Sequence, residues 1–159
     1  MSEDIRFTSG LGLQGNVTVV ARDAQGRIKA IRHLKNLVVN GGKGWMAGSL
    51  SGGIATPTNM KYIGVGTGST AATATDTALG GEVETRATGT QSVVTTTTTN
   101  DTYQCIGTVT MTAGRAITES GLFGASTSGT MMSRNVFSVI NLNSTDTLAV
   151  TWKIPMTAV

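Results

Sequence analysis

The chain has 159 residues, of which 39% are hydrophobic, 4% aromatic and only 13% charged, and its formal net charge is +3. This length predicts one domain that can bury a sizeable core. No apolar run is long enough for a membrane-spanning helix, which excludes that class of protein. A single cysteine, Cys105, and a single histidine, His33, exclude an internal disulfide and a zinc site with two histidines from one chain.

The composition also points to a fold class. Glycine is abundant at 21 residues, proline is scarce at 2, and the glycines follow no collagen-like repeat. Threonine is frequent, and its branched β-carbon favours extended backbone. The amino end carries acids and no hydrophobic signal region, so we expect synthesis in a cytosol. We expect an all-β protein with many turns.

The first elements in chain order are an arm and a hairpin. Residues 1–15 are polar and glycine-punctuated, and "GLGLQG" is too flexible for the interior of a core strand, so we expect an extended N-terminal arm. "NVTVVAR" (16–22) and "RIKAI" (27–31) flank "DAQG", whose Asp23 and Gly26 suit a type I turn. This pattern predicts a β-hairpin.

The next stretch holds the predicted helical segments. Residues 43–50 are expected to form two helical turns with Trp45 and Met46 facing inward, although three glycines lie within or beside them. "MKYIGVGTG" (60–68) is expected to be a strand. Asp76 is expected to start one turn of helix in "DTALGGEVE".

Threonine-rich sequence then leads into a strand. Residues 84–99 read as extended, and the tract 95–99 is expected to be an exposed strand or strand end. Asn100 and Asp101 form the predicted turn before "TYQCIGTVTMT". Gly107 lies on the buried face of that strand, where it marks a bulge or a close approach of backbone. The other residues on this face are Tyr103, Cys105, Val109 and Met111.

The carboxyl-terminal third predicts a hairpin and a final strand. "AITESGLFG" (116–124) and "TMMSRNVFSVI" (130–140) flank the turn sequence "ASTSG". In "DTLAVTWKIPM" (146–156) every second residue is apolar, which predicts one buried face formed by Leu148, Val150, Trp152, Ile154 and Met156. Pro155 cannot donate to a ladder, so the strand should be at an edge there, or end there.

These elements amount to about eight short strands with turns between them and almost no helix. They predict an all-β fold, a two-sheet antiparallel sandwich of jelly-roll type with at most one or two short helices. The expected organisation is an extended N-terminal arm over residues 1–15 and a single β-sandwich domain over residues 16–159.

The stretch "YIGVGTGS" (62–69) has glycine at every second position, at Gly64, Gly66 and Gly68. A dinucleotide-binding fingerprint needs a third glycine where this chain has Ser69, and it must open a helix. The following "TAATATDT" is poor helix material, and the chain has no P-loop motif. We therefore interpret the stretch as a strand with one bare face, against which an aromatic ring or another backbone lies.

Three sets of residues are candidates for chemistry, and each has a structural alternative. Cys105 and His33 could pair as nucleophile and base, but the cysteine shares a parity with core residues and is better explained as one of them. Glu82 and Glu84 would share a strand face, as glycosidase carboxylates do, but a surface face or pairing with Arg86 is the favoured interpretation.

Glu119 is the third candidate, because it lies in the otherwise apolar "ITESGLF". A buried carboxylate is costly unless it is paired or accepts backbone N–H bonds. We favour a structural network with Arg115, Arg134 or local backbone over catalysis. The sequence thus predicts no catalytic, cofactor or metal site, and a protein that is not an enzyme.

Positive charge is concentrated in the N-terminal part of the chain, because seven of the twelve Lys and Arg residues precede Trp45. A nucleic-acid footprint combines clustered cations with stacking aromatic residues, and only Trp45 is near, so the pattern argues against a nucleic-acid partner. We interpret these cations as solvated strand faces or as a patch that meets an acidic protein surface.

Three stretches of the chain, taken in order, resemble small virion structural proteins of tailed bacteriophages. They are "LKNLVVNGGKGWMAGSL", "MKYIGVGTGSTAATATDTALGGEV" and "ITESGLFGASTSGTMMSRNVFSVINLNSTDTLAVTWKI", and they cover about half of the chain. Proteins with this pattern are head decoration (cement) proteins or tail-fibre-associated proteins.

The resemblance implies a structural protein of a virion, made in the host bacterial cytoplasm. Within that setting we expect a capsid decoration protein on the outer head surface. It would bridge neighbouring major capsid subunits and associate with itself as a dimer or trimer, with no small-molecule substrate and no membrane. The alternative is a tail- or fibre-associated adaptor or carbohydrate-binding module. The chain has no fibre-like repeat and few aromatic residues for stacking on sugars, which favours decoration.

Candidate contact residues follow from the flexible composition of the arm and from the charge asymmetry. We expect them to touch the shell or a sister subunit. The arm candidates are Ile5, Arg6, Phe7, Leu11 and Leu13, and those in the basic stretch are Arg22, Arg27, Lys29, Arg32 and Lys35.

Overall fold

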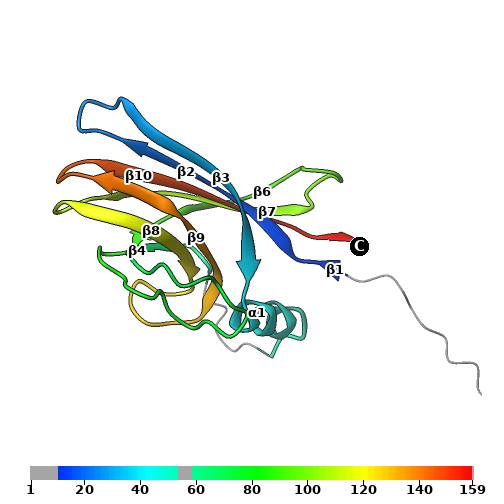
Figure 1. Cartoon of the computed structure of the whole chain (residues 1–159). Coiled ribbons are helices and arrows are strands. Elements are labelled where there is room, and N and C mark those ends of the chain that lie inside the picture. Colours follow the sequence, from blue (N-terminus) through cyan, green and yellow to red (C-terminus); the bar gives the residue numbers. More distant parts are fainter. Residues whose placement is uncertain (1–10, 54–58, 159) are drawn as a thin grey trace, which may run out of the picture.

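The computed structural model describes residues 11–53 and 59–158, which contain eleven strands and one helix (Figure 1). The elements are β1 (Leu11–Gly12), β2 (Gln14–Arg22), β3 (Ile28–Val38), α1 (Asn40–Leu50), β4 (Tyr62–Gly66), β5 (Ala87–Thr88), β6 (Thr90–Val94), β7 (Thr102–Thr110), β8 (Arg115–Phe123), β9 (Met131–Leu142), β10 (Thr147–Pro155) and β11 (Thr157–Ala158). The predicted all-β class is confirmed.

Nine strands form one antiparallel sheet in the order β5-β4-β8-β9-β3-β2-β10-β7-β6. Figure 1 shows β2, β3 and β10 in one layer and β4, β8 and β9 in the facing layer. The fold is therefore sandwich-like, as predicted, but its two layers belong to a single curled sheet. β1 and β11 pair separately as a two-stranded ribbon at one end of the molecule.

The sheet passes from one layer to the other between β3 and β9. These strands pair only at Leu37–Arg134 and Val38–Ser133, and beyond that point they diverge. Side chains bridge the opening: the Asn135 amide donates to the carbonyl of Lys35. This short pairing bends the sheet into two layers.

At the opposite side the sheet nearly closes into a barrel. β5 pairs with β4 and β6 pairs with β7, and Gly89 is the residue between β5 and β6. The Gly89 N–H donates to the Lys61 carbonyl at 2.7 Å, and Gly107 of β7 packs against the Gly89 backbone. The close backbone approach predicted at Gly107 is thus confirmed.

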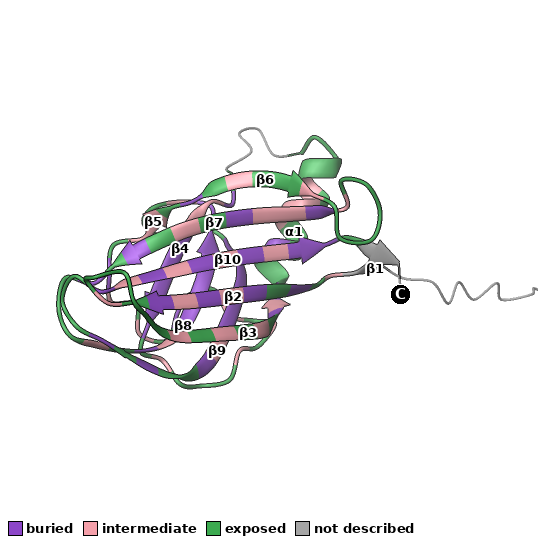
Figure 2. Ribbon diagram, turned by 90° about the horizontal axis from the view of Figure 1, so that it is seen from above, coloured by how far each residue is buried: buried purple, intermediate pink, exposed green. Residues whose placement is uncertain are grey.

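The core lies between the two layers. Figure 2 shows buried and partly exposed residues alternating along β10, whose inner face carries the predicted set Leu148, Val150, Trp152 and Ile154. Met156 was predicted to continue this face, but it is 45% exposed. The reason is that β10 ends at Pro155, as the proline predicted, so the alternation stops there.

The N-terminal hairpin of β2 and β3 is confirmed. The Asp23 carboxylate accepts hydrogen bonds from the backbone N–H groups of Gln25 and Arg27, and Gly26 adopts a positive φ of 80°. Residues 1–10 of the predicted arm lie outside the described residues. Leu11 and Gly12 form β1, and Gln14 and Gly15 begin β2, so most of this part of the arm lies in strands.

Helix α1 begins at Asn40, three residues before its predicted start, and it ends at Leu50 as predicted. Trp45 and Met46 are half-buried against the core, as expected. Gly42 is the buried residue of this helix, and a Cβ at this position would meet the backbone carbonyl of Met132. Glycine therefore allows the helix to lie directly on β9.

Two local predictions were wrong. Residues 95–99 form a loop rather than a strand, because the Asp101 carboxylate accepts the N–H groups of Thr96, Thr97 and Thr98 at 2.8 Å. Asp76 starts no helix; its carboxylate binds Thr73 in a turn. In both cases an aspartate organises a turn around its own side chain.

Gly89→Ala should destabilise the protein by about 1–3 kcal/mol, because the new Cβ would lie 2.5 Å from the Cys105 Sγ and overpack the barrel closure. Gly44→Ala is the matched control: it lies in α1 with open space around it, and should gain up to about 1 kcal/mol from helix propensity. Urea unfolding measures both changes. Equal effects of the two substitutions would contradict a tight closure at Gly89.

Candidate functional site

Residues 67–86, here called the strap, cover the outer face of β4 and β8. The strap is joined to β4 by the hydrogen bond from the Val83 N–H to the Val65 carbonyl, at 3.1 Å. The predicted bare strand face lies beneath it. The Phe123 ring packs beside Gly64, and the backbone of Gly81 lies against Gly66. The interpretation of the alternating glycines as a strand face is therefore confirmed.

The carboxylate of Glu119 is the centre of this region. It is fully buried, and it accepts two hydrogen bonds from the Arg134 guanidinium, at 2.8 and 2.9 Å. Three backbone N–H groups donate to it at 2.8–3.1 Å, those of Gly68, Gly80 and Gly81. The predicted structural network with Arg134 and local backbone is confirmed.

Arg134 extends this network to Asp76 in the strap. Its Nη1 lies 2.7 Å from the Asp76 carboxylate, and its Nη2 donates to the Thr70 carbonyl at 3.1 Å. Burial disfavours the charged form of Asp76, but hydrogen bonds from Thr73 and Arg134 outweigh it and hold the pKa of Asp76 below its usual range. One buried cation thus ties β8, β9 and the strap together.

Arg115, the other predicted partner of Glu119, instead binds Glu84 at 3.0 Å. Glu84 also accepts a hydrogen bond from the Thr112 hydroxyl at 2.8 Å. Burial opposes ionisation of Glu84, but hydrogen bonds from Arg115 and Thr112 prevail and lower the pKa of Glu84. This ion pair braces the start of β8 against the end of the strap.

Glu82 has a different partner, as the favoured interpretation predicted. Its two carboxylate oxygens receive the Arg86 guanidinium at 2.6 and 2.9 Å. The same guanidinium lies 3.4 Å from the centre of the Phe123 ring and donates to the Ala125 and Ser128 carbonyls. Glu82 and Glu84 are therefore held by separate cations, and the structure does not bring them together as an acid–base pair.

Cys105 and His33 are not brought together either. The thiol is buried in the core, where burial raises the pKa of Cys105. His33 is exposed on β3 and its Nδ1 lies 3.1 Å from the Thr18 hydroxyl. Within residues 11–53 and 59–158 there is no group of three His, Cys, Asp or Glu residues that could hold a metal ion.

Acidic and basic residues of the described part of the chain differ in how they are used: the acids bind groups of the protein itself, whereas about half of the cations form no salt bridge. Nine Asp and Glu residues occur in the chain, and two, Glu3 and Asp4, lie outside the described residues. Each of the other seven accepts hydrogen bonds from the protein itself. Six described cations form no salt bridge with another described residue: Arg22, Arg32, Lys35, Lys43, Lys61 and Lys153. Among the described carboxylates only Asp101 forms no salt bridge, so the unpaired charge of the described residues is positive.

Four of the five basic residues predicted to contact a partner bind other groups of the same chain. Arg27 and Lys29 form salt bridges with Asp23 and Asp146, each at 2.6 Å. Arg22 donates to a turn carbonyl and Arg32 to the Ser138 hydroxyl.

Lys35 remains exposed on β3. It pairs in register with Asn16, which pairs with Lys153 on the other side, so the two lysines face outward two strands apart. A positively charged row therefore crosses the outer face of β3, β2 and β10.

The predicted arm residues Ile5, Arg6 and Phe7 lie outside the described residues. Leu11 is in β1, where it pairs with Ala158. Leu13 is half-buried and packs against the core.

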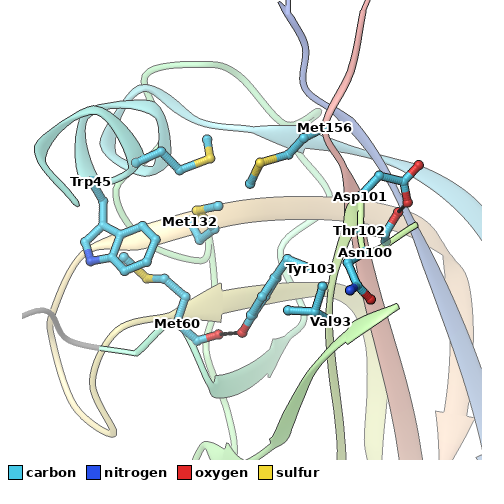
Figure 3. Close-up of a pocket in the computed structure, with 10 residues that line it drawn as sticks. Trp45, Met60, Val93, Asn100, Asp101, Thr102, Tyr103, Met132 and Met156 are labelled. Atoms are coloured by element: carbon cyan, nitrogen blue, oxygen red, sulfur yellow. Dashed lines mark hydrogen bonds between the residues drawn. The ribbon is translucent and has the colours of Figure 1, made fainter. Parts of the chain in front are cut away.

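An apolar groove that the sequence did not reveal runs between α1, β7 and the segment after β10. We call it the methionine groove; most of its lining is apolar or aromatic, from Trp45, Met46, Met60, Tyr103, Met132 and Met156. Val93 and the polar residues Asn100, Asp101 and Thr102 complete the lining. Figure 3 shows Trp45, Met60, Tyr103, Met132 and Met156 around a common hollow. The Tyr103 hydroxyl donates to the Met60 carbonyl at 2.5 Å. The high methionine content, 7 residues, was the only sequence signal for it.

The groove consists of two adjoining hollows of about 330 Å³ each, which share Trp45, Met46 and Met156. The second hollow continues along α1 past Lys43 to Leu50, which is 90% exposed. Methionine side chains adapt to the shape of an apolar guest. The groove can therefore hold apolar side chains of a partner.

Comparison with known proteins found no matching family model, no matching curated protein and no matching solved structure. Across the described part of the chain, no helix has the length and apolar character needed to cross a membrane.

Arg134→Met should lower the free energy of unfolding by about 3–5 kcal/mol, because it leaves the buried Glu119 carboxylate without its cation. Arg27→Met removes an ion pair of similar length from an exposed turn, and should leave stability close to that of the wild type. Chemical denaturation of both variants tests this. Similar losses in the two variants would argue against a special role for the buried pair.

Glu84 should contribute to acid sensitivity. Because its pKa is lowered in the folded state, its contribution is complete above its unfolded pKa of about 4.3 and is lost as the pH falls through the lower folded value. Glu84→Gln should therefore show a shallower decline of unfolding free energy below about pH 4.3 than the wild type. Urea midpoints measured from pH 7 to pH 2 provide the comparison, and parallel curves would contradict it.

Proposed function

We propose that the protein is a structural protein of a tailed-bacteriophage virion that binds the outer surface of the head and bridges neighbouring major capsid subunits. The observation that carries this proposal is that the motifs of the phage resemblance meet in one internal network. The glycine-rich strand at 64–68 supplies the bare face and a donor, Asp76 binds Arg134, and "TESGLF" supplies Glu119 and Phe123.

This use of the motif residues favours a structural role. Glu119 and Arg134 hold the strap, while Leu79 of the strap packs with Phe123 and Met131 in a second small core. Residues that carry chemistry would be expected to face a cleft with free polar atoms. Here the motif residues fix the shape of the molecule, which is what a clamp between capsid subunits requires.

The surface offers the means of attachment. All seven described carboxylates are engaged internally, and the outward cations include the row of Lys35 and Lys153. A surface of this sign is attracted to an acidic partner surface. Around the row, the outer sheet face carries threonines and the exposed Ile31 and Ile106.

The proposed mechanism is mechanical. Each copy makes modest contacts to more than one capsid subunit, and the many copies on a head act together through multivalency. The stiff barrel transmits the load, so that neighbouring subunits resist separation under the pressure of the packaged DNA.

The test is the number of copies per virion in the phage that encodes this chain, measured by quantitative mass spectrometry. A decoration protein should be present in proportion to the major capsid protein. A number that matches a tail or portal component would overturn head decoration and support the tail- or fibre-associated alternative, for which a glycan array of the purified protein is the next experiment.

Contact through the lysine row is tested separately. Lys35→Glu and Lys153→Glu should each reduce binding of the purified protein to heads that lack it, with a larger reduction at physiological than at high salt. Lys61→Glu reverses a cation outside the row and is the matched control. If all three variants bind like the wild type, the row is not the contact surface.

A further inference from the structure

The methionine groove lies at the end of the barrel where the chain enters β2 and leaves β10. Leu13, the residue between β1 and β2, lines one hollow together with Met156, the residue between β10 and β11. Figure 1 shows the β1–β11 ribbon projecting from this end of the barrel. The ten residues that precede β1 are therefore attached beside an apolar groove.

The sequence of those residues complements the groove. Ile5 and Phe7 share the parity of Leu13, so an extended chain presents all three on one side. Just before them are Glu3 and Asp4, the two acids outside the described residues. Lys43 lies at the rim of the groove and forms no salt bridge with a described residue.

We propose that the N-terminal segment of a second copy occupies the methionine groove, with Ile5 and Phe7 as apolar anchors and with Glu3 or Asp4 close to Lys43. Each hollow, at about 330 Å³, is of a size that accepts one large side chain. The contact is reciprocal when two copies exchange segments, so each pair of copies gains two such contacts.

The direction of β1 favours a second copy over the chain's own segment. β1 runs toward the barrel from outside, so the segment before it must reverse direction to enter its own groove, whereas it can extend directly to a neighbour (Figure 1). The six residues from Ile5 to Gly10 span at most about 20 Å when extended, which is enough to cross a subunit boundary. The inference concerns self-association and does not depend on binding to a phage head.

The first test measures self-association of the full chain by sedimentation velocity over a range of concentrations. Phe7→Ala should weaken association about tenfold or more, because it removes a large apolar side chain from the groove. Thr8→Ala changes the neighbouring residue on the opposite side of an extended chain and should associate like the wild type. A wild-type chain that stays monomeric at all concentrations would overturn the proposal.

The second test changes the groove. Met156→Arg should also weaken association about tenfold or more, because it places a charge where the apolar anchors bind. Val139→Arg is the matched control, since Val139 has a similar exposure, 49% against 45%, and does not line the groove. Leu50→Arg, at a position that is 90% exposed, tests the same groove if Met156→Arg does not fold.

Mixing the two variants distinguishes the exchange of N-terminal segments from other ways of self-association. Phe7→Ala keeps an intact groove and Met156→Arg keeps an intact segment, so a mixture should form heterodimers that neither variant forms alone at the same concentration. Association that is insensitive to both substitutions would overturn the proposal.

Trp45 fluorescence distinguishes a groove that is filled by the chain's own N-terminal segment from one that is filled by the segment of a second copy. Trp152 is buried in the core, and Trp45→Phe gives its background. If Phe7→Ala changes Trp45 emission in a strictly monomeric chain, the segment fills its own groove and exchange is refuted.

Discussion

The buried ion pair of Glu119 and Arg134 is the interaction on which the rest of this structure depends. A carboxylate with no exposure is stable only if its oxygens are satisfied, and here a guanidinium and three backbone N–H groups do so. Those N–H groups can approach because glycines line the strap and β4: a Cβ at Gly66 or Gly68 would meet the carboxylate itself. The strap therefore covers β4 and β8 through a polar contact that only this glycine pattern permits.

This arrangement also decides the character of the surface. Most acidic side chains form salt bridges within the protein that stabilise turns and connect the layers. The cations without such partners therefore make the exterior positive, although the net charge is only +3. Only 13% of the residues are charged, so few charges are available on the exterior. A few lysines on the outer sheet face can then set the orientation of a partner without requiring a pocket.

Local patterns in the sequence predicted the local structure well where a residue type favours one conformation, and they carried no information on partners that are distant in the chain. The alternation in β10 and the Asp23 turn depend on neighbours along the chain, and both are confirmed. Asp76 was misjudged as a helix start because aspartate favours both helix N-caps and turns, and here its carboxylate binds Thr73, three residues before it. Its contact with Arg134, 58 residues away, has no local signal in the sequence. Glu119 could be predicted to be buried and paired from its apolar surroundings, but the choice of Arg134 over Arg115 depends on strand register. The methionine groove combines α1, β7, β9 and Met156, which no local pattern joins.

The two surfaces have different physical tasks, and their placement allows both to act at once. The lysine row lies on the outer face of β3, β2 and β10, whereas the groove opens between α1 and the ends of β7 and β10. A partner on the sheet face therefore does not need to displace a segment in the groove. Apolar burial in the groove is little affected by salt, while attraction to the lysine row is screened by it. Self-association should therefore depend less on ionic strength than attachment to an acidic surface, apart from the contribution of the proposed contact of Glu3 or Asp4 with Lys43.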